Sequence, residues 1–189
     1  MADLPPLNDR DGLPEALRVL LSDYPREAWE ADPGFAGLVQ FWLERHGMFR
    51  KLNALLSDDA AAAMDGRMGT EDYRGRLSHF GGMLLGQLHD HHHIEDAHYF
   101  PQLTRLDARL EQGFALLDSD HHALDGLMRD FADAANAVLA PGQPDAALMA
   151  RIARFRETGL RFARLVERHL DDEEDLIVPL LLKHGAPGL

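Results

Sequence analysis

Hydrophobic residues recur along most of the chain at alternating steps of three and four, which is the period of an amphipathic α-helix. No segment shows the sustained alternation that marks a half-buried strand. The pattern predicts four long helices, over about 34–57, 71–104, 108–139 and 145–183. Because the connections are short, consecutive helices are expected to be antiparallel neighbours. The sequence therefore predicts an all-α, up-down-up-down four-helix bundle.

Several shorter features punctuate this pattern. Residues 57–70 are expected to form a loop, and Pro101 is expected to perturb the last turns of the second helix. The turn at 140–144 ends the third helix. Residues 1–33 form an N-terminal extension, in which a short helix near 14–22 is predicted to pack across one end of the bundle. The bundle domain is assigned to residues 34–185.

Polar residues interrupt the hydrophobic seam of every long helix. They are His46 in the first helix, His91, Glu95 and His98 in the second, His121 in the third, and His169 and Glu173 in the fourth. A polar group on such a seam faces the core, where leaving it without a partner costs about 1–3 kcal/mol. These side chains must therefore satisfy one another or bind a ligand.

Part of this pattern occurs twice. The stretches HHHIEDAHYFP and HLDDEEDLIVP lie at 91–101 and 169–179. Both begin with His, carry acids four and five residues after it, and have Pro ten residues after it. A His and a Glu four residues apart lie about 6 Å apart on one helix face, so both can bind the same cation or two adjacent cations. The repeat indicates two helical hairpins of similar design that face each other.

The predicted ligand set is too large for one zinc ion. Four imidazoles and two carboxylates exceed the four ligands of a tetrahedral zinc site. Two metal ions that share the two carboxylates as bridges account for the set better. Among redox metals, iron suits imidazole and carboxylate ligands best, and zinc and manganese also bind them.

Composition excludes several other classes of protein. The chain has no cysteine, which removes disulfides, iron–sulfur clusters and Cys-type zinc sites. Its net charge of −13 offers no basic surface for nucleic acid or anionic lipid. Neither a signal peptide nor an apolar run long enough to span a bilayer is visible. We expect a soluble cytoplasmic protein without a nucleic-acid or membrane partner. Its oligomeric state is not readable from the sequence.

Four motifs in a fixed order resemble the hemerythrin family, and most closely its HHE cation-binding branch. They are WLERH around His46, HHHIED with YFP, DHHALD at 120–125, and HLDDEED with VP, and they cover roughly residues 35–183. The resemblance implies a non-haem di-iron centre. By the same resemblance, the iron ligands are His46, His91, His121 and His169, and the bridging carboxylates are Glu95 and Glu173.

The chain departs from the hemerythrin pattern at two places. Hemerythrins carry a second histidine one turn after that of the third helix, where this chain has Asp125. The fifth histidine is then His98, on the seam three residues after Glu95, or else His92, whose counterpart in the repeat is the apolar Leu170. The last acid of the family lies five residues after its histidine, at Glu174, whereas the seam favours Glu173 four residues after it.

Four functions are consistent with these residues. The first is a di-iron protein that binds or senses dioxygen or another small diatomic ligand. The second is a di-iron oxidoreductase that acts on peroxide or nitric oxide. The third is iron storage or donation, and the fourth is a structural bundle whose histidines hydrogen-bond to each other.

Overall fold

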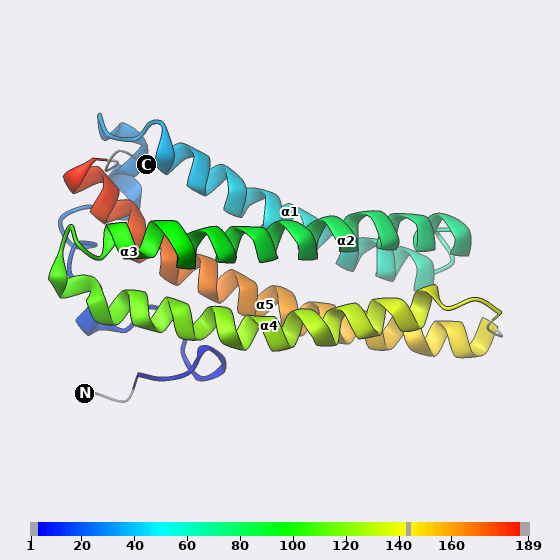
Figure 1. Cartoon of the computed structure of the whole chain (residues 1–189). Coiled ribbons are helices and arrows are strands. Elements are labelled where there is room, and N and C mark those ends of the chain that lie inside the picture. The colour runs from blue at the N-terminus through cyan, green and yellow to red at the C-terminus, as the bar shows by residue number, and fades with distance from the viewer. Residues whose placement is uncertain (1–3, 143–144, 186–189) are drawn as a thin grey trace. The chain divides into compact units, whose positions relative to one another are not determined.

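A computed structural model describes residues 4–142 and 145–185, and in this part of the chain every regular element is helical (Figure 1). The main elements are α1 (Leu38–Met64), α2 (Thr70–Ile94), η4 (Glu95–Tyr99), α3 (Phe100–Leu103), α4 (Glu111–Leu139) and α5 (Asp145–His184). Short 3₁₀ turns are η1 (Leu7–Asp9), η2 (Glu15–Leu17), η3 (Arg26–Ala31) and η5 (Ala108–Leu110). The prediction of an all-α bundle is confirmed.

The first helix is longer than its pattern predicted. Residues 57–64 were expected in a loop but form the last turns of α1. Four consecutive alanines at 60–63 explain the difference, because alanine has the highest helix propensity. Just after the helix, Gly66 has a φ of 70°, which is favourable only for glycine, and the next amide, of Arg67, donates to the carbonyl of Ala62.

The N-terminal extension contains less helix than expected. The helix predicted at 14–22 is reduced to the single 3₁₀ turn η2, followed by irregular turns. Its apolar side chains are nevertheless buried, and Leu13, Leu17 and Trp29 join the same core cluster as Leu176 and Leu180 of α5. Tertiary packing therefore holds this segment in place without a regular helix. Residues 143–144 of the predicted turn lie outside the described residues.

The second predicted helix changes its winding near its end. Residues 95–99 form the π-helix η4, in which the amide of Phe100 donates to the carbonyl of Glu95, five residues earlier. Pro101 has no amide hydrogen to donate to the carbonyl of Ala97, so the α-helical hydrogen-bond pattern cannot continue through it. A π turn contains one extra residue, which rotates all later side chains by about 100° relative to an ideal α-helix.

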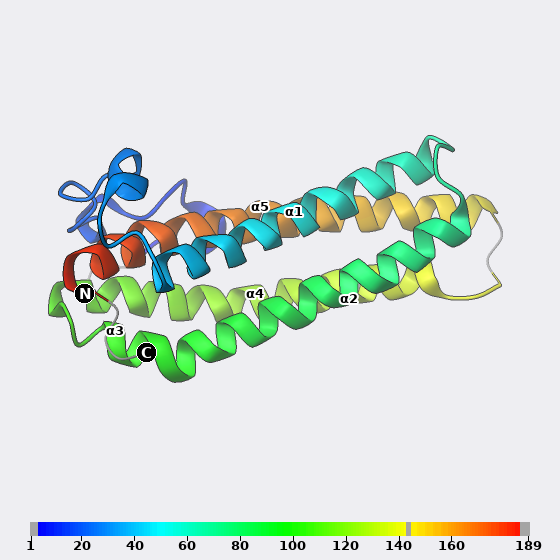
Figure 2. The same cartoon turned by 90° about the horizontal axis from the view of Figure 1, so that it is seen from above.

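The chain divides into two compact units, and each long helix contributes a segment to both. The first unit comprises residues 1–47, 91–123 and 166–189, and the second comprises 48–90 and 124–165. Within the first unit, the beginnings of α1 and α4 run beside the ends of α2 and α5, so neighbouring segments alternate in direction (Figure 2). Both units can therefore be described as antiparallel four-helix arrangements.

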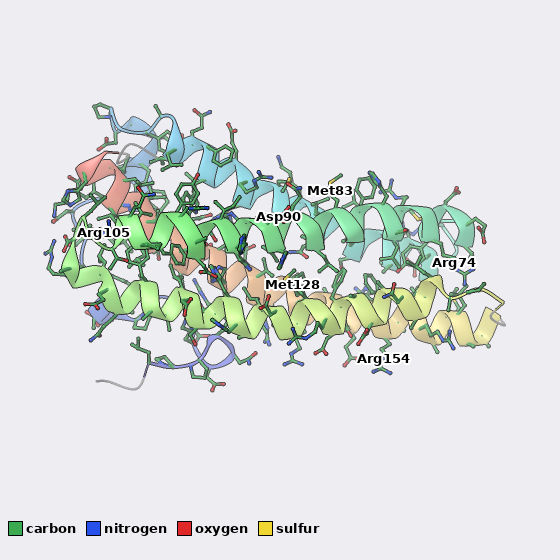
Figure 3. All side chains as sticks on the ribbon, in the orientation of Figure 1. Arg74, Met83, Asp90, Arg105, Met128 and Arg154 are labelled. Atoms are coloured by element: carbon green, nitrogen blue, oxygen red, sulfur yellow. The ribbon has the colours of Figure 1, made fainter. Side chains whose placement is uncertain are left out.

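Each unit has its own hydrophobic core. In the first unit the core includes Trp42, Phe114 and Leu117. In the second unit, Phe131 packs against Phe155 and Phe162 with ring centroids 5.0 and 5.1 Å away. Charged side chains surround the second unit, among them Arg154 of α5 (Figure 3). Across the described residues, no helix is both long and apolar enough to cross a membrane.

Candidate metal centre

Histidines and glutamates from five helical segments converge inside the first unit. They are His46 from α1, His91 and His92 from α2, Glu95 from η4, His121 from α4, and His169 and Glu173 from α5. His46, Glu95, His169 and Glu173 are completely buried, and His121 and His92 are nearly so. Such a concentration of buried ionisable groups requires strong partners among themselves or a bound cation.

These side chains form two groups. The first group contains His46, His91, Glu95 and Glu173, and the second contains His92, His121 and His169. In each group the potential ligand atoms lie within 4.8 Å of one another. Ligand atoms on opposite sides of one transition-metal ion are about 4.2 Å apart, since each bond is about 2.1 Å long. Small side-chain movements are enough to close each group around one ion.

The two glutamates extend from the first group to the second. Glu173 places Oε1 3.5 Å from Nε2 of His46 and Oε2 3.4 Å from Nε2 of His169. Glu95 places Oε1 3.0 Å from Nε2 of His91 and Oε2 3.6 Å from Nε2 of His121. Each carboxylate therefore presents one oxygen to each group, which is the arrangement of two bridges between two ions.

Three histidines direct Nδ1 at a carboxylate behind them. The pairs are His46 with Glu174 at 2.9 Å, His121 with Asp96 at 2.8 Å, and His169 with Asp120 at 3.5 Å. An Nδ1–H that faces a carboxylate leaves the Nε2 lone pair free for a metal ion. In agreement, the Nε2 atoms approach each other across the site, at 3.2 Å for His46 and His91 and 3.1 Å for His121 and His169.

Several buried atoms of the site lack a hydrogen-bond partner among the described residues. They include both carboxylate oxygens of Glu95, Oε2 of Glu173 and both ring nitrogens of His92. A buried polar atom without a partner is costly, so these atoms are suited to bind a cation. The donor set, which contains imidazole nitrogens and carboxylate oxygens alone, fits iron and also zinc or manganese.

Protonation differs between histidines of the site. Burial lowers the pKa of His91 to about 3, and burial with neighbouring His121 and His169 lowers the pKa of His92 well below its usual range. Both are therefore neutral at neutral pH, as ligands must be. Burial also disfavours a charged His169, but Asp120 and Glu173 outweigh it and raise its pKa to about 9. A cation that binds His169 must displace its proton.

Aromatic side chains enclose the groups. Trp42 donates a hydrogen bond from Nε1 to Oε1 of Glu173, and its ring lies 4.9 Å from that of Tyr99. Phe100 stacks on His121 with centroids 5.5 Å apart. The position of Trp42 in the WLERH motif did not reveal its hydrogen bond to the carboxylate. The rings keep bulk water from the polar atoms and orient one carboxylate.

The structure brings together six of the seven residues that the sequence singled out, and His98 is the exception. Its side chain is exposed and belongs to neither group, because the π turn of η4 rotates it away from the seam. His92 is buried in its place, in the second group. The sequence repeat indicated this position, because Leu170, the counterpart of His92, is apolar. In the structure Leu170 is completely buried, as His92 nearly is.

The structure also separates the two adjacent acids of α5. Glu173 converges with the histidines, whereas Glu174 lies behind His46 and contacts its Nδ1. Asp125 has an exposed side chain and takes no part in either group.

Comparison with known protein families agrees with this geometry. The family described as Hemerythrin HHE cation binding domain matches residues 37–181. This range covers most of the chain and includes all residues of both groups. Comparisons with curated proteins and with solved structures gave no match.

Proposed function

The chain belongs to the hemerythrin HHE cation-binding family, and we propose that it holds two iron ions in a dinuclear centre that binds or senses dioxygen. One observation carries the proposal: Glu95 and Glu173 each present one oxygen to each histidine group. Every residue of the two groups lies within the bundle domain that we assign to residues 34–185.

In this proposal each group would hold one ion. His46 and His91 would bind the first ion, and His92, His121 and His169 the second, with Glu95 and Glu173 offering one oxygen to each. The first group offers fewer protein ligands than the second, so we propose that a small ligand such as dioxygen would bind on the side of His46 and His91.

The protein residues around the groups suit a small neutral ligand. Iron would supply the electrons for binding dioxygen. Trp42 holds Glu173 by its hydrogen bond, and Phe100 and Trp42 restrict access of water. The carboxylates behind the histidines fix the ring orientation and favour the tautomer with its proton on Nδ1, which leaves Nε2 available.

A second function is favoured by one observation. Tyr99 is half-buried, and its ring lies 4.9 Å from that of Trp42, which contacts Glu173. Two oxidisable side chains between the site and the surface are suited to carry electrons. This arrangement favours a di-iron oxidoreductase that reduces peroxide or nitric oxide.

Metal analysis combined with an optical spectrum tests these functions. Protein loaded anaerobically with Fe²⁺ should contain two iron ions per chain, and air should produce a new visible absorption band. A band that disappears when dioxygen is removed supports binding or sensing, whereas continuous consumption of peroxide or nitric oxide with a reductant supports the oxidoreductase. Iron that a mild chelator removes within minutes supports storage or donation. Absence of stoichiometric metal would contradict all three.

A further inference from the structure

Arg10 of the N-terminal extension is buried directly behind the second group. Its Nε donates to Oδ2 of Asp172 at 2.7 Å, and its Nη1 donates to Oδ1 of Asp120 at 3.0 Å. Its Nη2 donates to the other oxygen of Asp120. The side chain of Arg10 is 2% exposed, as is that of Asp120. Because Oδ2 of Asp120 lies 3.5 Å from Nδ1 of His169, a continuous series of contacts leads from Arg10 to the site.

Arg26 of the same extension makes the equivalent connection to the first group. Its Nη1 donates to Oε2 of Glu174 at 3.0 Å, and its Nε donates to Oδ1 of Asp175 at 2.6 Å. The other oxygen of Glu174 lies 2.9 Å from Nδ1 of His46. Each group therefore contains one histidine that is connected to an arginine of the extension through one carboxylate.

The guanidinium groups restrict where these carboxylates can point. Arg10 binds both oxygens of Asp120, and a planar guanidinium that binds two oxygens determines the plane of the carboxylate. A carboxylate that faces Nδ1 in turn determines the ring orientation and hence the direction of Nε2. Without the arginines, Asp120 and Glu174 each lose a partner that holds their orientation, and the alignment of His169 and His46 is weakened.

We propose that the N-terminal extension is a positioning element of the metal centre, in which Arg10 and Arg26 orient His169 and His46 through Asp120 and Glu174. This inference rests on the proposed cation site. Both arginines precede the segment that matches the family, which begins at residue 37, so the family match does not include them. Arg10 and Arg26 touch no ligand atom of either group and are therefore positioning residues.

The test compares variants of the full chain. Arg10→Met and Arg26→Met remove the guanidinium groups, and Arg10→Lys keeps the charge but cannot bind both oxygens in one plane. Arg76→Met is the matched control, because Arg76 binds both oxygens of Asp59 within the second unit and has no contact with the site. Co²⁺ is the probe, since its visible spectrum reports ligand geometry, and competition with a chelator measures its affinity.

We expect Arg10→Met and Arg26→Met each to weaken Co²⁺ binding by about 10-fold to 100-fold and to change its visible spectrum. Arg10→Lys should restore part of the affinity, and Arg76→Met should bind like the wild type. Circular dichroism establishes that each variant is folded. If Arg10→Met does not fold, Arg26→Met decides alone, because its guanidinium is partly exposed and its removal leaves no cavity in the core.

Two results would overturn the inference. Folded Arg26→Met and Arg10→Met with the affinity and spectrum of the wild type would exclude the positioning role while leaving the metal centre intact. A wild-type protein that binds neither Co²⁺ nor Fe²⁺ would overturn the proposed function itself, and this inference with it.

Discussion

His92 stacks face to face on His121, with ring centroids 4.1 Å apart and an angle of 14° between the ring planes. Both rings belong to the second group, together with His169. Neither nitrogen of His92 has a hydrogen-bond partner among the described residues. The fifth histidine of the centre that we propose is therefore His92 and not His98.

This assignment gives a first prediction. His92→Ala should retain fewer metal ions per chain than the wild type, because the second group loses one of its three imidazoles. His98→Ala is the control and should keep the metal content of the wild type, since the His98 side chain is exposed. Metal analysis after gel filtration measures both. Loss of metal in His98→Ala with retention in His92→Ala would refute the assignment.

The two adjacent acids of α5 give a second prediction. Glu173→Gln should reduce the metal content by at least one ion per chain, because the two oxygens of Glu173 face one group each. Glu174→Gln should still bind two ions at saturation, with affinity lower by about 10-fold to 100-fold, since Glu174 belongs to neither group and contacts Nδ1 of His46 behind the ring. Titration with Fe²⁺ under anaerobic conditions distinguishes the two. Equal stoichiometry in both variants would contradict a bridging Glu173.

The metal-free protein should be most stable near pH 6.5. An unfolded histidine has a pKa of about 6.5. The pKa of His169 is raised to about 9. The contribution of His169 to the free energy of unfolding is therefore complete below pH 6.5 and is lost as the pH rises through 9. The pKa of His91 is lowered to about 3, so the unfolded state binds the extra proton and stability falls as the pH decreases from 6.5 towards 3.

Thermal unfolding of chelator-treated protein between pH 5 and 9.5 measures this dependence. The alkaline loss should amount to about 3 kcal/mol, or roughly 6–12 °C in Tm. His169→Gln should lose the part of the alkaline dependence that His169 contributes, keep the part from His46, whose pKa is also raised by Glu173 and Glu174, and keep the acidic dependence. A Tm that rises steadily between pH 6.5 and 9 would contradict the raised pKa of His169.

The packing of α4 against α5 gives a fourth prediction. A Cβ added to Gly113 would lie 2.6 Å from Cδ1 of Leu176, which is closer than packed carbon atoms approach. Gly113→Ala should therefore destabilise the protein by about 1–3 kcal/mol, partly offset by the higher helix propensity of alanine. In Gly86→Ala the new Cβ has no atom within 4 Å, and the change should stabilise by about 0.5–1 kcal/mol.

Urea unfolding of the two alanine variants measures both free energies. The two substitutions are expected to change the free energy of unfolding in opposite directions, because both glycines lie inside helices and differ mainly in the space around them. Equal stabilisation by both substitutions would show that Leu176 moves aside without cost.

The sequence by itself determined the helical class of the fold and most of the converging residues. His46, His121 and His169 were identified because an α-helix of constant period keeps one stripe of residues facing the core. His98 was misplaced for the same reason, since a constant stripe requires an unbroken α-helix and η4 winds as a π-helix. Pro101 signalled a perturbation but did not determine which way the side chains would turn.

Tertiary structure decided the distances at which the groups are connected and which carboxylates and arginines lie behind them. The sharing of Glu95 and Glu173 between two histidine groups depends on the lateral distance of four helices, which periodicity along one helix cannot supply. Arg10 contacts Asp120 and Asp172, which lie 110 and 162 residues away along the chain, and no repeated spacing links them. Helix periodicity reflects local hydrogen bonding and can be predicted from neighbouring residues, whereas these contacts form only when distant segments pack together.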